Sequence, residues 1–185
     1  MTPKQGKHTM PPMSDKLIPE TIDPNRFAEQ NLTLEGNVRL ADMARLNSTL
    51  NAPEDVVAVR LTFGVDEQGT TFIKGHLDTT LVVECQRCME PFRYEIISDF
   101  AVGIVTSLDE VNTLPENYEP ALAQDGKLAL RELIEDELIL NLPIIPKHEP
   151  EDCNVKLPLK DPEWEKGKGD NPFQVLESLK HKQIK

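Results

Sequence analysis

The sequence is poor in aromatic residues, in cysteine and in long apolar runs. Aromatic residues make up 5% and hydrophobic residues 38% of the 185 positions, which predicts a modest core joined to extended segments. Three cysteines are too few for the disulfide framework of a small secreted domain. The densest apolar stretch, Leu138 to Ile145, is interrupted by Asn141 and Pro143 and is much shorter than the roughly 18 residues of a membrane-spanning helix. Because the first residues also lack the apolar stretch of a signal peptide, we expect a cytoplasmic protein with no membrane partner.

Motifs of the common enzyme classes are missing as well. The sequence has no G-x-x-x-x-G-K-[ST], no G-x-G-x-x-G and no H-E-x-x-H. His76 falls on the polar side of a predicted strand. Glu137 falls inside an apolar helical stripe, where pairing with a cation such as Arg131 or Lys127 is a better explanation than general-base catalysis. The sequence therefore predicts a protein that is not an enzyme.

Negative charge is abundant. The net charge is −12 and the pI is about 4.8. Such a chain repels nucleic-acid phosphates unless its basic residues are segregated, so we expect no DNA partner. The acidity serves either solubility or the recognition of a basic partner.

Composition divides the chain into four segments. Residues 1–16 are polar and rich in proline and lysine, which predicts a disordered leader; Met13 is an alternative start that would make residues 1–12 an added extension. Residues 17–146 carry the regular patterns of a folded core. Residues 147–170 predict an extended linker, and residues 171–185 predict a short basic helix that begins at Asn171 and Pro172.

Three runs in the core segment alternate apolar and polar side chains, as half-buried strands do. They span Val57–Val65, Ile73–Cys85 and Phe92–Ile104, and short turns connect them. We expect them to form an antiparallel meander with one solvent-exposed face. A further strand is expected over Leu32–Leu40, broken near Gly36, and an acidic loop over Ser107–Pro120.

An amphipathic helix over Lys127–Leu140 is the predicted cover of this sheet. Its apolar stripe holds Leu130, Leu133, Ile134 and Leu138. Glu132, Glu135 and Asp136 are predicted to point away. Shorter helices are expected over Asp23–Gln30 and Asp42–Leu50. Together the patterns predict an α+β fold: an antiparallel β-meander covered by one amphipathic helix, with short N-terminal helices, an extended acidic tail and a C-terminal helix.

The sequence Cys85-Gln86-Arg87-Cys88 lies at the predicted tip of a long hairpin. A redox pair of the thioredoxin type needs a helix that begins at the first cysteine, and Pro91 with the strand behind it argues against one. A zinc knuckle presents two thiolates from such a tip, and His148 and Cys153 offer the two remaining ligands of a Cys3His site. The alternative, that Cys85 is a core residue and the other two cysteines are incidental, stays open.

Four motifs resemble those of the YceD family, the large ribosomal RNA subunit accumulation proteins. They are V-E-C-Q-R-C at 83–88, L-P-E-N-Y-E-P at 114–120, E-D-E-L-I-L-N-L-P at 135–143 and N-P-F-Q-V-L-E-S-L-K at 171–180. The resemblance runs from about Leu17 to Lys180. It implies a non-enzymatic role in the synthesis, processing or stability of 23S rRNA, and it supplies no catalytic residues.

This resemblance implies as partner a pre-ribosomal particle, 23S rRNA or a basic large-subunit ribosomal protein. The acidity favours the basic protein. Competing classes are a zinc-binding or thiol-redox protein that uses Cys85 and Cys88, and a generic acidic interaction module. The expected RNA or partner contacts are Arg87, Arg93, Phe173, Lys180, Lys182 and Lys185.

Overall fold

The computed structural model describes residues 16–47, 50, 56–149 and 152–153. Most of the predicted leader and linker, and the whole predicted C-terminal helix at 171–185, lie outside the described residues. The elements, in chain order, are β1 (Thr21–Ile22), α1 (Pro24–Glu29), β2 (Thr33–Arg39), the 3₁₀ helix η1 (Leu40–Asp42), α2 (Ala44–Asn47), β3 (Val56–Val65), β4 (Thr71–Glu84), β5 (Pro91–Val105), the 3₁₀ helix η2 (Leu108–Thr113), β6 (Glu119–Leu122), β7 (Leu128–Ala129) and α3 (Leu130–Asn141).

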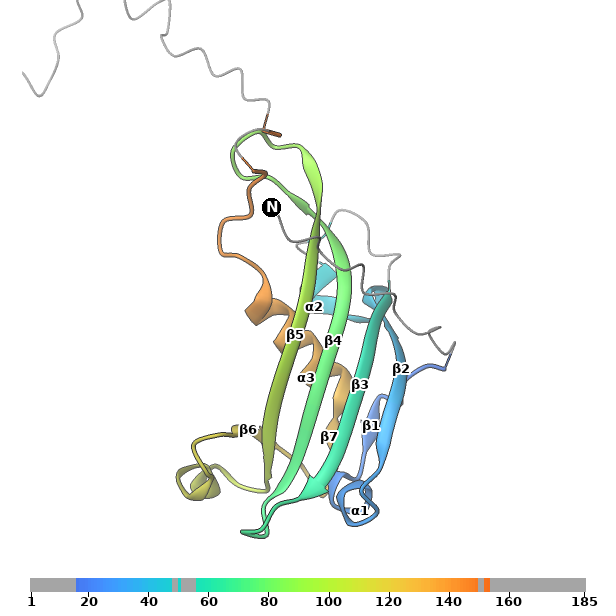
Figure 1. The fold of residues 1–185 in the computed structure, drawn as a ribbon, viewed down its shortest axis with the longest axis vertical. Coiled ribbons are helices and arrows are strands. Elements are labelled where there is room, and N and C mark those ends of the chain that lie inside the picture. Colours follow the sequence, from blue (N-terminus) through green and yellow to red (C-terminus); the bar gives the residue numbers. More distant parts are fainter. Residues whose placement is uncertain (1–15, 48–49, 51–55, 150–151, 154–185) are drawn as a thin grey trace, which may run out of the picture. The chain divides into compact units, whose positions relative to one another are not determined.

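The main sheet has five strands in the order β2-β3-β4-β5-β6 (Figure 1). Neighbouring strands run antiparallel except β5 and β6, which are parallel. The register places Phe63 opposite Ile73 and Leu77 opposite Ser98. The predicted meander of three strands is therefore confirmed. The further strand expected over Leu32–Leu40 is β2, at one edge of the sheet, whereas β6 at the other edge was not predicted. A second, two-stranded sheet pairs β1 with β7.

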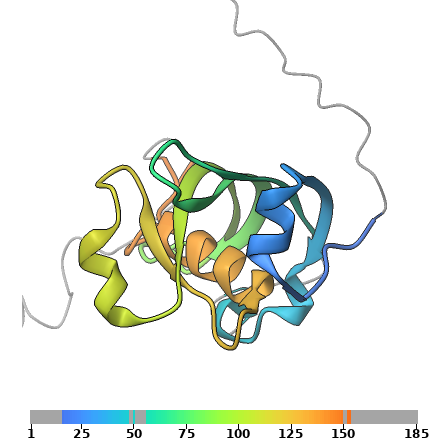
Figure 2. The same cartoon turned by 90° about the horizontal axis from the view of Figure 1, so that it is seen from below.

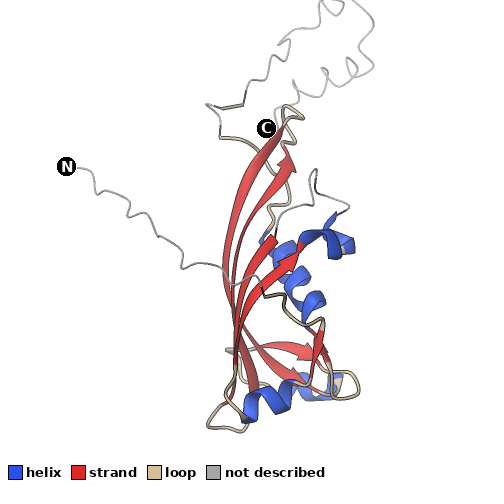
Figure 3. Ribbon diagram, turned by 90° about the vertical axis from the view of Figure 1, so that its right-hand side faces the viewer, coloured by secondary structure: helices blue, strands red, loops and turns tan. Residues whose placement is uncertain are grey.

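Helix α3 covers the inner face of the sheet, as the amphipathic pattern predicted. Leu130, Ile134 and Leu138 of α3 are fully buried in one core with the inward residues of β3 and β4. Figure 3 views the sheet nearly edge-on, with helices on one side, and Figure 2 shows α3 between α1 and η2. Helix α1 begins as predicted, with the Asp23 carboxylate accepting from the backbone N–H of Arg26. The α+β fold class is confirmed.

Several boundaries differ from the predictions. Strand β2 continues through Gly36 because this position has no side chain: a Cβ there would lie 2.2 Å from the carbonyl oxygen of Lys16. Helix α3 begins at Leu130, three residues later than predicted, because Leu128 and Ala129 pair with β1. The expected loop over Ser107–Pro120 contains η2 and the start of β6.

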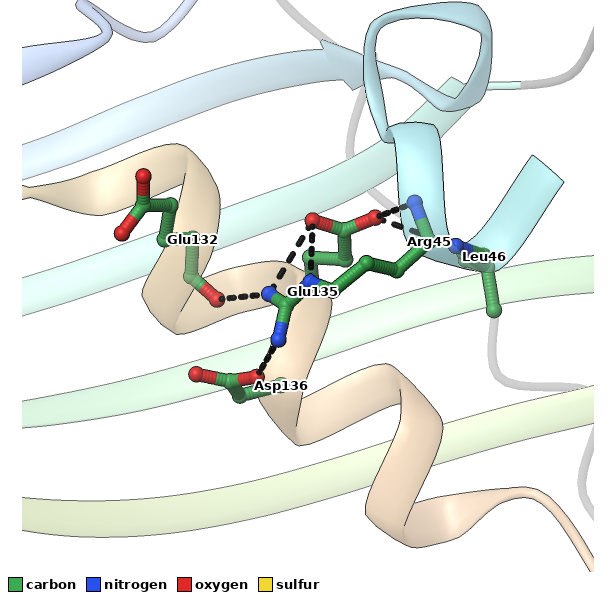
Figure 4. A network of polar contacts seen from close by, with 5 residues as sticks. All are labelled: Arg45, Leu46, Glu132, Glu135 and Asp136. Atoms are coloured by element: carbon green, nitrogen blue, oxygen red, sulfur yellow. Dashed lines mark hydrogen bonds and ion pairs between the residues drawn. The ribbon is translucent and has the colours of Figure 1, made fainter. Parts of the chain in front are cut away.

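The prediction that Glu135 points away from the core is wrong. Its side chain is buried and bridges α3 to α2 (Figure 4). One carboxylate oxygen accepts from the backbone N–H groups of Arg45 and Leu46, at 2.7 and 3.0 Å, and the other accepts from the Arg45 guanidinium. The first N–H groups of a helix have no partner inside it, so Glu135 supplies one for α2 from a distant part of the chain. Asp136 also pairs with Arg45.

Glu137 has a different partner from the one expected. Its Oε1 accepts from the Ser98 hydroxyl at 2.7 Å and from the Asn141 amide at 2.8 Å, so it ties α3 to β5 rather than to a cation. Arg131 pairs instead with Glu20 at 3.1 Å. These contacts give Glu137 a structural explanation that needs no catalytic role.

The hairpin of β4 and β5 extends beyond the rest of the sheet. Strand β4 pairs with β3 as far as Asp78, and from Thr79 to Glu84 its ladder partner among the described residues is β5. This two-stranded extension, the β4–β5 arm, runs toward the upper end of Figure 1. Among the described residues, no helix is long and apolar enough to cross a membrane.

Candidate metal centre

The tip of the β4–β5 arm is a tight turn that brings two cysteines together. The backbone N–H of Cys85 donates to the carbonyl oxygen of Glu90 at 2.9 Å, and that of Met89 donates to Cys85 at 2.8 Å. Met89 adopts a positive φ of 62°, which closes the turn before β5 begins at Pro91. Because no helix starts at either cysteine, the setting expected of a thioredoxin-type pair is not found here.

The other two predicted ligands come from the chain that leaves α3. Helix α3 ends at Asn141, and the following segment runs to the tip of the arm (Figure 1). The Gln86 N–H donates to the carbonyl oxygen of Pro146 at 2.8 Å, and the His148 ring packs on Phe92 with centroids 4.7 Å apart. A turn after His148, in which the N–H groups of Asp152 and Cys153 donate to the carbonyl oxygen of Glu149, returns Cys153 to the tip.

All four predicted ligands therefore meet. The ligand atoms of Cys85, Cys88, His148 and Cys153 lie within 4.8 Å of one another. The Sγ atoms of Cys85 and Cys153 are 3.8 Å apart, and Cys88 Sγ lies 3.3 Å from His148 Nδ1. In a tetrahedral zinc site with Zn–S near 2.3 Å and Zn–N near 2.0–2.1 Å, the S–S and S–N edges are about 3.8 and 3.6 Å. A disulfide needs sulfurs about 2.05 Å apart, and all three cysteines are free.

Burial and hydrogen bonding separate the acidities of two thiols. Cys85 is fully buried and Cys88 is half-buried. Burial opposes ionisation of Cys85, but backbone N–H groups of His148 and of the turn outweigh it and lower the pKa of Cys85 to about 5. Burial, together with the neighbouring sulfurs, raises the pKa of Cys88 to about 11. Ionisation of Cys85 is thus favoured and ionisation of Cys88 is opposed, and a bound divalent cation would stabilise both thiolates.

Arg87 lies beside the cluster and contacts its ligands. Its Nε donates to Cys153 Sγ at 2.9 Å and its Nη2 donates to the carbonyl oxygen of His148 at 3.3 Å. The bond to Cys153 raises the pKa of Arg87. Three thiolates and one divalent cation would leave one uncompensated negative charge, which the guanidinium can balance. From the sequence we expected Arg87 to contact RNA or a partner. Its hydrogen bonds to Cys153 and His148 were not predicted.

Of the remaining predicted contact residues, the structure describes Arg93 alone. Arg93 is exposed on β5, opposite Val82. Phe173, Lys180, Lys182 and Lys185 lie outside the described residues. Sequence reasoning also missed the Gln86–Pro146 hydrogen bond, because a backbone contact between segments this far apart leaves no local pattern.

The arrangement suits a structural metal better than a catalytic one. Four protein ligands fill a tetrahedral shell and leave no position for water or substrate. Binding would tie the tip of the arm to the segment after α3. The residues thus fit a Zn²⁺ ion by number, type, spacing and charge.

Comparison with known proteins agrees with the resemblance in the sequence motifs. The family described as "Large ribosomal RNA subunit accumulation protein YceD" matches residues 73–180, which include the arm, α3 and the four ligands. A protein of Haemophilus influenzae with that same name is 37% identical over 176 residues, covering 92% of this chain and 100% of the relative. No solved structure matches the chain. The chain belongs to the YceD family of large ribosomal RNA subunit accumulation proteins.

Proposed function

We propose that this protein is a non-enzymatic cytoplasmic factor for biogenesis of the large ribosomal subunit. It supports the synthesis, processing or stability of 23S rRNA by binding a pre-ribosomal particle, the RNA itself or a basic ribosomal protein. The observation that carries the proposal is membership of a family named for accumulation of this RNA, across nearly the whole chain. The buried Glu135 and the half-buried Glu137 both have structural partners, which supports a binding role rather than catalysis.

We further propose that Cys85, Cys88, His148 and Cys153 hold one structural Zn²⁺. The spacing of the four ligand atoms and the position of Arg87 support this assignment. When bound, the ion would fix the tip of the arm relative to the end of α3. Arg87 would then balance the negative charge at Cys153. Contacts of Arg87, Arg93 and the C-terminal lysines with RNA are proposed separately and do not depend on the metal.

A deletion strain tests the ribosomal role. Loss of the gene should lower the amount of 23S rRNA relative to 16S rRNA and reduce the large-subunit peak in a density gradient. The wild-type gene should restore both, Cys88→Ser should restore them poorly, and Met89→Ser, an exposed neighbour in the same turn, should restore them fully. An unchanged ratio of 23S to 16S rRNA in the deletion strain would contradict the proposal.

Cobalt substitution tests the ligand set. Co²⁺ bound by three thiolates in a tetrahedral site should give intense thiolate-to-metal absorption and d–d bands typical of four-coordination. Cys153→Ser should weaken the thiolate absorption, whereas Ser98→Ala, a change in β5 outside the ligand set, should leave it unchanged. A spectrum typical of six-coordinate Co²⁺ with oxygen ligands would count against the site.

A further inference from the structure

The carboxyl end of α3 leaves several large apolar side chains in water. Leu140 is 74% exposed and Ile144 is 98% exposed, and Ile139 and Ile145 are exposed as well. Two of these, Ile139 and Ile144, line an open groove of about 730 Å³ with Leu50 and Val83. Leu140 and Ile145 are their neighbours in the chain, and large apolar side chains gathered on the surface of a folded domain commonly mark an interface. We refer to Ile139, Leu140, Ile144, Ile145 and this groove as the α3 patch.

The groove is held in shape by contacts already described. Its two walls are the β4–β5 arm, through Val83 and Gln86, and the segment after α3, through Leu142 and Pro146. The Gln86–Pro146 hydrogen bond joins these walls, and the Cys3His cluster lies just beyond it. A partner would therefore meet a preformed surface and lose little free energy in ordering it.

Charge around the α3 patch decides which partner fits. Glu84 lines the groove, and Asp136 is exposed one helical turn before Leu140. The carboxyl end of α3 adds the negative end of the helix dipole. Arg45 also lines the groove and is paired with Glu135 and Asp136, and Lys147, which follows the lining residue Pro146 in the chain, is exposed. Beside the groove, three acidic side chains (Glu84, Glu135 and Asp136) outnumber two basic ones (Arg45 and Lys147). Across the described residues there are roughly two acidic side chains for each basic one. Both the local and the overall charge therefore favour a cationic partner.

These charges disfavour three other occupants. RNA would bring phosphates to an apolar surface with an acidic rim. A second copy of this chain would bring the same excess of acidic side chains to the patch. An anionic membrane surface would likewise repel the acidic rim of the patch. A basic polypeptide with exposed apolar side chains satisfies both the apolar centre and the acidic rim.

We propose that the α3 patch is the docking surface for a basic protein segment bearing apolar side chains, the chemistry that a large-subunit ribosomal protein offers. The inference rests on the proposed function and names the partner class for it. The Cys3His cluster then has an indirect role, because it holds one wall of the groove in place.

Binding of purified components tests this directly. The probes are the ribosomal proteins of the large subunit, purified individually, and protein-free 23S rRNA, each titrated against the full-length protein in fluorescence anisotropy. At least one ribosomal protein should bind the wild type, and Leu140→Ser with Ile144→Ser should weaken that binding at least about tenfold. The matched control is Ile97→Ser with Leu108→Ser, which removes two apolar side chains exposed elsewhere and should leave affinity unchanged.

Three results would overturn the inference. The first is equal affinity of the wild type and the α3-patch variant for the ribosomal protein. The second is that the wild type binds 23S rRNA but no ribosomal protein. The third is that the α3-patch variant loses only self-association. Complementation of the deletion strain keeps this failure distinct from failure of the proposed function. If the patch variant restores 23S rRNA as well as the control does, the docking surface is wrong while the ribosomal role stands. If deletion changes no ribosomal RNA, the ribosomal role itself fails.

Discussion

At the residue scale, Glu135 connects two helices, α3 and α2, that are far apart in the sequence. Its carboxylate serves two backbone N–H groups and one guanidinium that are about 90 positions away in sequence. Helical periodicity placed Glu135 on the outer side of α3 because a wheel records only neighbours within one helix. The partners belong to α2, whose position over α3 depends on the fold of the intervening strands.

Replacing Glu135 should therefore destabilise the whole fold. Glu135→Gln keeps the size of the side chain but removes the negative charge that attracts the Arg45 guanidinium. It also weakens the hydrogen bonds that the side chain accepts from the backbone N–H groups of Arg45 and Leu46. We expect a loss of about 1–3 kcal/mol in the free energy of unfolding at neutral pH, measured by urea denaturation. Glu132→Gln, an exposed position on the same helix, is the control. Equal stability of the two variants would show that the Glu135 network contributes nothing.

The same residue predicts a response to acid. Burial would raise the pKa of Glu135, but the Leu46 N–H and then Arg45 outweigh it, so the pKa is lowered in the folded state. The stabilisation is complete above the ordinary glutamate pKa of about 4.3 and is lost as pH falls through the lower folded pKa. The stability gap between wild type and Glu135→Gln should therefore narrow between neutral pH and pH about 3. A gap that stays constant in urea denaturation across this range would refute the assignment.

At the scale of elements, alternation predicted the central strands well and the edges poorly. Strands β3, β4 and β5 are long and have one buried face, which gives a clear period of two. Strand β6 is four residues long, and its pairing with β5 depends on a loop that no local pattern describes. In β2, Gly36 suggested a break because glycine weakens strands, but here it admits the backbone of Lys16.

Gly36→Ala should release that backbone contact. The new Cβ would clash with the Lys16 carbonyl oxygen, which accepts from the Asn37 N–H at 2.9 Å. The paired Ile18 N–H, which donates to the Asn37 carbonyl oxygen at 3.1 Å, should exchange with deuterium much faster. Thr33→Ala, an exposed change in the same strand, should leave Ile18 protected. Unchanged exchange at Ile18 in Gly36→Ala would show that the close approach is not maintained in solution.

At the scale of the whole molecule, the Cys3His cluster joins two parts of the chain that are about 60 positions apart in sequence. The four members of the cluster were predictable from residue type and from the strand pattern on either side of Cys85 and Cys88. The path that brings His148 and Cys153 to the arm was not, because it depends on the end of α3 and on the Gln86–Pro146 bond. The predicted role of the C-terminal helix falls outside the described residues and stays a prediction.

Removing the metal should open the arm locally. After chelation, the Gln86 N–H should lose its partner Pro146 and exchange faster, because the segment after α3 is no longer held at the tip. The amide of Leu77, in the middle of the sheet, should keep its protection. Loss of protection at both sites would mean that the metal holds the entire fold, and loss at neither would mean that it holds nothing.

The zinc content of the purified protein shows directly whether Cys85, Cys88, His148 and Cys153 hold a metal ion. Mass spectrometry under native conditions, with elemental analysis, should find one zinc ion per full-length chain. Cys88→Ser should lose the ion, and Met89→Ser, which alters the same turn without removing a ligand, should retain it. Substoichiometric zinc in the wild type after growth in zinc-supplemented medium, or equal zinc in the two variants, would show that these four residues do not form a zinc site.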